Sequence, residues 1–242
     1  MALDKQLRRQ SLWLRDSYIW LLSAKVAQGR SGMSALDVGC GPGFVMEILG
    51  KLFAVTGVDT DEDMVRACRA KDLSVQKASA YRLPYRDCSF DIVYCSFLLL
   101  WLKEPSKALE EMSRVSKAHV LCLGEPDLGA RIDHPESLAG LGPLLVEGMR
   151  KQGADPFMGR KLRQLFKRCG LMVEVGVHPG VWDITKLRQE YEDEWRYIES
   201  TATTASDDQM RRLREAWREA LSARTLFQYN PIFYALGRKR WA

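Results

Sequence analysis

The stretch ALDVGCGPGF, residues 35–44, places an apolar run and an acid directly before three alternating glycines. Residues 35–38 have the pattern of a buried strand, and the glycines predict a tight turn whose backbone comes close to another molecule. A helix is expected to follow at once, with Val45, Ile48, Leu49 and Leu52 on one face. A strand, a glycine loop and a helix in this order are typical of α/β folds that bind nucleotides.

The composition bounds the class of protein. A chain of 242 residues with 46% hydrophobic residues is long enough for one α/β domain with insertions, and its formal charge of +5 indicates solubility rather than nucleic-acid binding. The segment MALDKQLRRQ is too charged for a secretory signal, and the longest apolar run, residues 95–102, is too short to cross a bilayer. The six cysteines form no CxxC pair and the three histidines lie far apart, so we predict reduced thiols, no metal site and a cytoplasmic protein.

Strands and helices are expected to alternate along the chain. Apolar runs predict seven strands, at residues 35–38, 54–58, 73–77, 90–97, 119–125, 171–177 and 226–237. Right-handed crossovers between them predict a doubly wound, mostly parallel sheet. We expect a single domain over residues 1–242, with a helical cap at residues 1–30 and helical insertions after the fifth and sixth strands, at residues 127–159 and 183–224. Insertions at these places usually cover or shape the site, and two charged helices are expected in the second one.

The spacing of the glycines narrows the choice of ligand. A dinucleotide fingerprint needs a third glycine, but that position holds Phe44 or Met46, depending on the starting glycine. The loop also has no lysine for a triphosphate. A nucleoside without phosphate fits better, because Asp59 at the end of the next strand can accept hydrogen bonds from both ribose hydroxyls.

These residues resemble the class I S-adenosylmethionine-dependent methyltransferases, in particular the group similar to ubiquinone- and menaquinone-pathway methyltransferases. LDVGCGPG (36–43) is similar to the first motif of that family, and VTGVDTDEDMV (55–65) to its acidic second strand. ASAYRLPYRDCSFDIVYCSFLLLWL (78–102) and PSKALEEMSRV (105–115) are similar to its adenine-side loop, fourth strand and following helix. The resemblance implies a Rossmann-like sheet whose last strand is reversed, and S-adenosyl-L-methionine as the cofactor.

The resemblance also implies roles for individual residues. Gly39, Gly41 and Gly43 would line the methionine moiety, and Asp59 would bind the ribose. Ser79 and Ala80 would face the adenine, although relatives commonly have an acid where Ser79 stands, and Cys95 and Ser96 would lie under the amino-acid end. The full cofactor set implied is Asp37, Gly39, Cys40, Gly41, Gly43, Asp59, Thr60, Met64, Ser79, Ala80, Cys95 and Ser96.

The methyl acceptor is less well defined by the sequence. We expect an enclosed pocket for a small molecule, with Trp101 and Tyr229 in its lining and a base drawn from His134, Asp127 or Tyr18. A protein side chain or a tRNA as acceptor, and a cofactor-binding module without turnover, stay open as alternatives. The basic segments RKLRQLFKR (160–168) and RRLREAWREA (211–220) are read as solvated helix faces rather than an RNA-binding surface. The sequence indicates no oligomeric state.

Overall fold

The computed structural model describes residues 2–180 and 184–240. The chain forms two compact units. The first comprises residues 1–125, 161–176 and 233–242, and the second comprises residues 126–160 and 177–232. Both predicted insertions therefore fall in the second unit.

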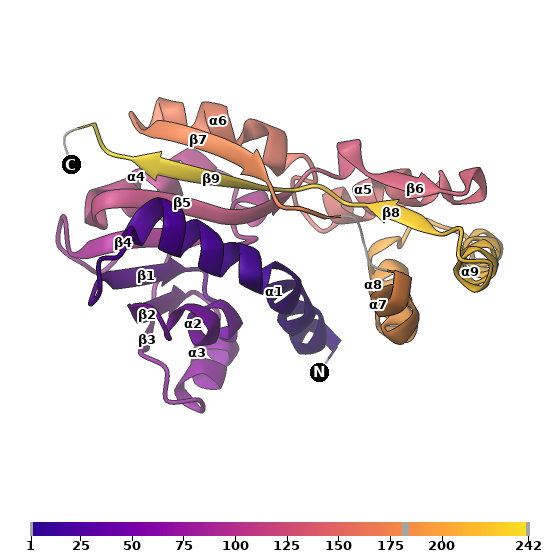
Figure 1. Cartoon of the computed structure of the whole chain (residues 1–242), viewed down its shortest axis with the longest axis horizontal. Helices are drawn as coiled ribbons and strands as arrows, with labels where there is room; N and C mark the ends of the chain where they lie inside the picture. The colour runs from indigo at the N-terminus through magenta and orange to yellow at the C-terminus, as the bar shows by residue number, and fades with distance from the viewer. Residues whose placement is uncertain (1, 181–183, 241–242) are drawn as a thin grey trace. The chain divides into compact units, whose positions relative to one another are not determined.

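A seven-stranded sheet carries the first unit, with strand order β3-β2-β1-β4-β5-β9-β7 (Figure 1). Its strands are β1 (Ser34–Val38), β2 (Ala54–Asp59), β3 (Val75–Lys77), β4 (Phe90–Cys95), β5 (Ser116–Pro126), β7 (Met172–Val177) and β9 (Ile232–Arg238). The strands from β3 to β5 are parallel neighbours, with Val38 opposite Val58 and Cys95 opposite Cys122. Their carboxyl ends therefore lie along one edge of the sheet, where α/β folds bind their ligands.

The last strand runs against the others. The N–H of Lys239, which follows β9, donates to the carbonyl of Ala118 near the start of β5 at 3.0 Å. The end of β9 thus lies beside the start of β5, which makes the pair antiparallel. The prediction of a mostly parallel seven-stranded sheet with a reversed last strand is confirmed.

Helices cover the sheet on both sides, with α1 (Ala2–Trp20) in front and α4 (Pro105–Val115) and α6 (Met158–Arg168) behind it in Figure 1. A π-helical stretch, Leu21–Ala27, continues α1, and the short α2 (Phe44–Leu49) and α3 (Glu62–Arg69) follow β1 and β2. Local chemistry sets their ends: the Asp61 carboxylate caps α3 by accepting from Asp63 N–H, and Pro105 occupies the first turn of α4. Gly170, with φ +74°, follows the end of α6, where only glycine adopts this left-handed conformation without strain.

The second unit is mainly helical. Its helices are α5 (Leu141–Lys151), α7 (Ile184–Gln189), α8 (Tyr191–Thr201) and α9 (Asp207–Ser222). A two-stranded antiparallel sheet joins β6 (Ile132–His134), in the first insertion, to β8 (Phe227–Tyr229), which follows the second insertion. Short 3₁₀ turns span Leu128–Ala130 and Glu136–Leu138 here, and Leu99–Trp101 in the first unit.

Three predictions about elements are wrong. The expected strand at 226–237 is divided into β8 and β9, which belong to different sheets, because Pro231 has no N–H for a ladder. The described part of the second insertion holds three helices instead of two, since the chain breaks at Glu190. Leu52 is exposed rather than buried, because α2 ends at Leu49.

No helix among residues 2–180 and 184–240 is long and apolar enough to cross a membrane. The same residues contain no group of three or more histidine, cysteine or carboxylate side chains that could hold a metal ion.

Candidate functional site

The glycine loop after β1 has the backbone that its sequence requires. Gly39, Gly41 and Gly43 have φ angles of +71°, +52° and +82°, a region that side chains other than glycine rarely adopt. The N–H groups of Gly39 and Cys40 both donate to the carbonyl of Val58 on β2, at 2.8 and 3.0 Å. The loop is thus anchored to the neighbouring strand at the carboxyl edge of the sheet.

The three glycines face different surroundings. A Cβ on Gly39 would lie 2.6 Å from Leu98 Cδ1, and a Cβ on Gly43 would overlap Leu73. A Cβ on Gly41 would meet no protein atom within 4 Å. Gly39 and Gly43 are therefore required for packing inside the protein, whereas Gly41 presents bare backbone to the open side of the loop, where a ligand can approach closely.

Asp59, at the end of β2, binds the same loop. Its Oδ2 accepts from Gly41 N–H at 2.8 Å, and its Oδ1 accepts from Asp61 N–H at 2.9 Å. A carboxylate has about four acceptor positions, so each oxygen keeps one for a further donor. The half-buried Asp59 can therefore position the loop and still accept two hydroxyl groups of a ligand.

Four further residues of the predicted cofactor set lie near this edge of the sheet and differ in how far they are exposed. Thr60 is exposed and Met64 is half-buried on the first turn of α3. Asp37 is 2% exposed, and burial raises its pKa well above the usual range. Cys40 is buried and packs with Met46 and Cys68.

The loop after β3 places the two residues expected to face adenine. Ser79 is half-buried and Ala80 is buried, and Ser79 Oγ accepts from Tyr81 N–H at 3.2 Å. Sequence analysis did not single out Arg114 on α4, which holds this loop. Its guanidinium donates to the carbonyls of Leu83 (3.0 Å) and Tyr85 (2.8 Å) while it is paired with Glu111. In the sequence, only the i, i+3 spacing of Glu111 and Arg114 indicated that these two residues could form an ion pair on one helix face.

At the end of β4, Ser96 is in contact with the hydroxyl of Tyr18. Cys95 is fully buried at the end of β4, and Ser96 follows it, half-buried. The hydroxyl of Tyr18 on α1 lies 2.9 Å from Ser96 Oγ, so the N-terminal helix reaches this edge of the sheet. Burial raises the pKa of Tyr18 far above its usual range, and the hydroxyl stays protonated at neutral pH. Its role as a base stays a prediction that its pKa does not support.

Glu125, at the end of β5, was also missed as a functional residue. It is fully buried and accepts from the backbone N–H groups of Leu99 (2.7 Å) and Leu100 (3.3 Å). It thereby fixes the chain after β4, where Phe97 has a strained φ of +52° and Trp101 is 47% exposed. An exposed aromatic ring at the carboxyl edge of the sheet agrees with the expected lining role of Trp101, which no contact tests.

Three predicted acceptor-side residues lie in the second unit. Asp127 is buried and forms a two-pronged ion pair with Arg160, at 2.5 and 2.6 Å. His134 is exposed on β6, opposite Phe227, and Tyr229 is half-buried on β8, opposite Ile132. Their proposed roles as base or pocket lining stay predictions.

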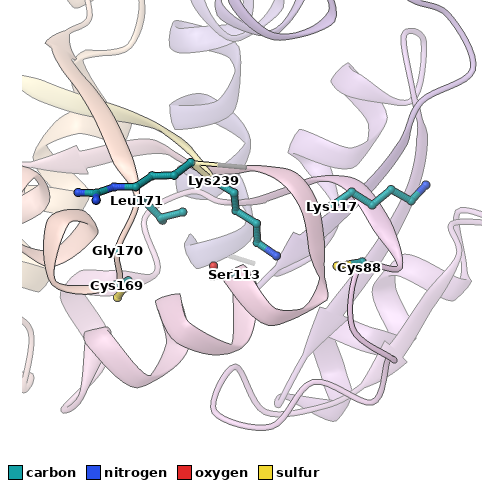
Figure 2. A pocket seen from close by; sticks show the side chains of 8 residues that line it. Cys88, Ser113, Lys117, Cys169, Gly170, Leu171 and Lys239 are labelled. Carbon is teal, nitrogen blue, oxygen red and sulfur yellow. The ribbon is translucent and has the colours of Figure 1, made fainter. Parts of the chain in front are cut away.

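A separate hollow of about 420 Å³ lies at the opposite edge of the sheet, lined by Cys88, Ser113, Lys117, Cys169, Gly170, Leu171, Lys239 and Arg240. Figure 2 shows Lys239 directed toward Ser113 and Lys117 pointing away from it. The ammonium groups are already bound, Lys117 to Asp91 (2.9 Å) and Lys239 to the Ser116 carbonyl (2.5 Å). Because these cations do not converge on one point, the hollow does not form a site for a compact anion.

Part of the chain is similar to a known protein family. The family described as a methyltransferase domain matches residues 36–123. Over 105 residues the chain is 37% identical to a demethylmenaquinone methyltransferase of Staphylococcus aureus, an alignment that covers 39% of this chain and 44% of that protein. Across this protein and three other curated relatives, the alignments span only 34% to 53% of the relatives' own lengths.

Solved structures share the fold over most of the chain. A protein of Anabaena variabilis, provisionally described as a methyltransferase from an antibiotic biosynthesis pathway, has a TM-score of 0.66 at 16% identity and covers 93% of this chain and 96% of its own. A phosphoethanolamine N-methyltransferase of Haemonchus contortus, solved with S-adenosylhomocysteine, has a TM-score of 0.53 at 20% identity, covering 90% of this chain and 52% of its own. The [4+2]-cyclase SpnF reaches a TM-score of 0.53 at 16% identity, covering 89% and 78%. Similarity at this level shows the fold alone, and the fold serves more than one reaction.

Proposed function

We propose that this chain, which carries a class I S-adenosylmethionine-dependent methyltransferase domain, transfers a methyl group from S-adenosylmethionine to a small-molecule acceptor. One observation carries the proposal: Asp59 holds the N–H of Gly41 while the side-chain position of Gly41 stays open. The glycine loop and the acid are thus arranged around one place at the carboxyl edge of the sheet.

The residues at this edge fit each part of the cofactor. The open side of Gly41 accommodates the methionine moiety against bare backbone, and the free acceptor positions of Asp59 suit the two ribose hydroxyls. The loop that Arg114 holds presents Ser79 and Ala80 to the adenine. Ser96, bound to Tyr18, lies under the amino-acid end.

The cofactor supplies an electrophilic methyl group and its own leaving group, so the protein must align the acceptor and exclude water. Glu125 accepts from Leu99 N–H and so fixes the segment that follows β4. The same segment carries the exposed ring of Trp101. An aromatic face near a cationic sulfur gains about 0.5–2 kcal/mol, depending on how well water is excluded. Trp101 is therefore the aromatic residue that we assign to the acceptor side.

A small-molecule acceptor is supported by the name of the demethylmenaquinone methyltransferase relative and by the insertions of the second unit. Incubation with methyl-labelled S-adenosylmethionine and an extract of the source organism tests it. We expect label in the small-molecule fraction after separation by size. Label in the protein or RNA fraction would instead support the macromolecular alternative.

A cofactor-dependent protein that transfers no methyl group is the second candidate, because the fold is shared with a protein named as a cyclase. Calorimetry with S-adenosylhomocysteine separates the two. Binding without any labelled product in any fraction would favour this candidate, and absence of binding would reject both.

A further inference from the structure

Two cysteines lie against the backbone of the glycine loop. Cys40 belongs to the loop, and Cys68 lies on α3. Both thiols are directed at the carbonyl oxygen of Gly41, with sulfur–oxygen distances of 3.6 Å from Cys40 and 3.2 Å from Cys68. The two side chains also belong to one buried cluster with Met46. Two sulfurs from separate elements thus meet at the residue that presents its backbone to the cofactor.

The surroundings keep this pair close together. Cys68 is fully buried and Cys40 is 7% exposed. A Cβ on Gly57 would lie 2.9 Å from Cys40 Sγ, and a Cβ on Gly43 would lie 3.0 Å from Cys68 Sγ. Glycine at both positions therefore makes room for the sulfurs, and the pair is packed directly on main chain.

The two thiols differ in the direction in which their pKa is shifted. The hydrogen bond from Cys40 and the charge of Lys71 lower the pKa of Cys68, in spite of its burial. The same hydrogen bond, together with burial, raises the pKa of Cys40. Since the thiolate is the nucleophile, the lowered pKa makes Cys68 the more readily ionised thiol of the pair.

We propose that Cys40 and Cys68 form a reversible disulfide with hydrogen peroxide as the oxidant, and that this modification switches off cofactor binding. The disulfide itself follows from the placement of the two sulfurs on Gly41, whereas its effect on the cofactor rests on the proposed function.

The chemistry balances with peroxide as the only co-reactant. The Cys68 thiolate attacks one peroxide oxygen and breaks the O–O bond, which gives a sulfenic acid and a hydroxide that takes up a proton to become water. The Cys40 sulfur then attacks the Cys68 sulfur, and the sulfenic oxygen leaves as a second water with the Cys40 proton. The two sulfurs lose two electrons in total, and a dithiol reductant returns them.

Closing the bond must disturb the loop. A disulfide brings its Cβ atoms to about 3.8 Å and removes both S–H donors from the Gly41 carbonyl. Gly41 also donates its N–H to Asp59, so a displaced Gly41 misplaces the acid expected to bind the ribose. Both contacts expected of the cofactor are therefore weakened by one covalent change.

The test treats the purified protein with a small excess of hydrogen peroxide. Peptide mass mapping should show Cys40 joined to Cys68, reversed by dithiothreitol. S-adenosylhomocysteine affinity, measured by calorimetry, should fall about tenfold or more on oxidation and recover on reduction. Cys68→Ser should abolish both the cross-link and the effect of peroxide on affinity, while Cys88→Ser, which removes an exposed thiol outside the loop, should leave both intact.

The outcomes separate the two proposals. A Cys40–Cys68 cross-link in a protein that never binds S-adenosylhomocysteine would overturn the proposed function and leave the modification site standing. A disulfide found instead between Cys95 and Cys122, which are opposite each other on β4 and β5, would overturn this inference. So would unchanged affinity in fully cross-linked protein. The mass mapping uses the unaltered chain, so it decides the matter even where Cys68→Ser fails to fold.

Discussion

At the scale of single residues, Asp59 does more than its sequence position indicates. Its two oxygens each accept a backbone N–H, one from Gly41 in the glycine loop and one from Asp61 at the start of α3. A residue expected only to bind a ribose therefore also joins the two segments that surround the site. The glycine loop and Asp59 are thus coupled by a hydrogen bond, so a change in either one affects the position of the other.

Asp59→Ala should weaken S-adenosylhomocysteine binding through both roles. Loss of a hydrogen bond to a charged acceptor costs about 1.5–3 kcal/mol, which corresponds to about 10-fold to 150-fold in the dissociation constant. Calorimetry measures the affinity, and thermal unfolding checks the fold. Asp61→Ala is the matched control, because it removes the cap of α3 and should lower stability by about 1 kcal/mol with little effect on binding. Equal losses of affinity in both variants would remove Asp59 from the binding site.

Gly41→Ala tests whether the ligand comes close to the backbone of Gly41, because the added methyl group has no protein neighbour. Its Cβ would meet no protein atom within 4 Å, so the folded state should lose only the cost of a side chain at φ +52°, about 1–2 kcal/mol. Gly170→Ala carries the same kind of strain, at φ +74° with no atom within 4 Å, but lies after α6. We expect similar melting temperatures for the two variants and a loss of cofactor affinity in Gly41→Ala alone. Native affinity in Gly41→Ala would contradict the assignment of the loop.

Some of these residues could be found in the sequence and others could not. The glycines and Asp59 stand at fixed distances from apolar runs, so their spacing carries the information. Glu125 and Arg114 act on main-chain groups, the N–H of Leu99 and the carbonyl of Leu83, that are far away along the chain. Main-chain groups are the same in every residue, and no sequence pattern marks the ones that need a partner.

At the scale of elements, local chemistry sets where the helices begin and end. The cap at Asp61, the proline at the start of α4 and the glycine after α6 act within one turn of chain. The division of the last strand was missed, although Pro231 marks the place. Its carbonyl still accepts from Asp127 N–H at 3.1 Å, so the chain stays extended across the break and keeps its strand-like apolar pattern.

The packing of α5 on α8 gives a prediction for the second unit. A Cβ on Gly148 would overlap the carbonyl of Thr201 at the end of α8, whereas a Cβ on Gly142, in the same helix, has ordinary contacts at 3.8 Å or more. Gly148→Ala should destabilise the second unit by about 3 kcal/mol, as an overpacked core does. Gly142→Ala should be neutral or stabilise by about 0.5–1 kcal/mol. Hydrogen exchange resolved along the chain measures both, and unchanged protection of α5 and α8 in Gly148→Ala would contradict this packing.

At the scale of the whole molecule, the two insertions form one structural unit. The sequence predicted two insertions that cover or shape the site, at 127–159 and 183–224, which are 24 or more residues apart. The contact of α5 with α8 joins them, and β6 of the first insertion also pairs with β8, which follows the second insertion. Pairing between segments so far apart depends on side chains of both, which no single stretch of sequence reveals.

Because the two insertions form one unit, a role of the second unit in acceptor binding has to be tested with both insertions in place. Deletion of residues 130–155 alone would remove β6 and α5 and leave the apolar faces of β8 and α8 without partners, so lost activity would report only misfolding. Gly148→Ala loosens the second unit as a whole with one added methyl group. If that unit selects the acceptor, the variant should keep S-adenosylhomocysteine affinity within a few-fold, because the glycine loop, Asp59 and Arg114 all belong to the first unit. Methyl transfer should fall steeply in the same preparation, and Gly142→Ala should retain it. Full transfer by Gly148→Ala, with hydrogen exchange showing a loosened second unit, would place acceptor binding entirely in the first unit.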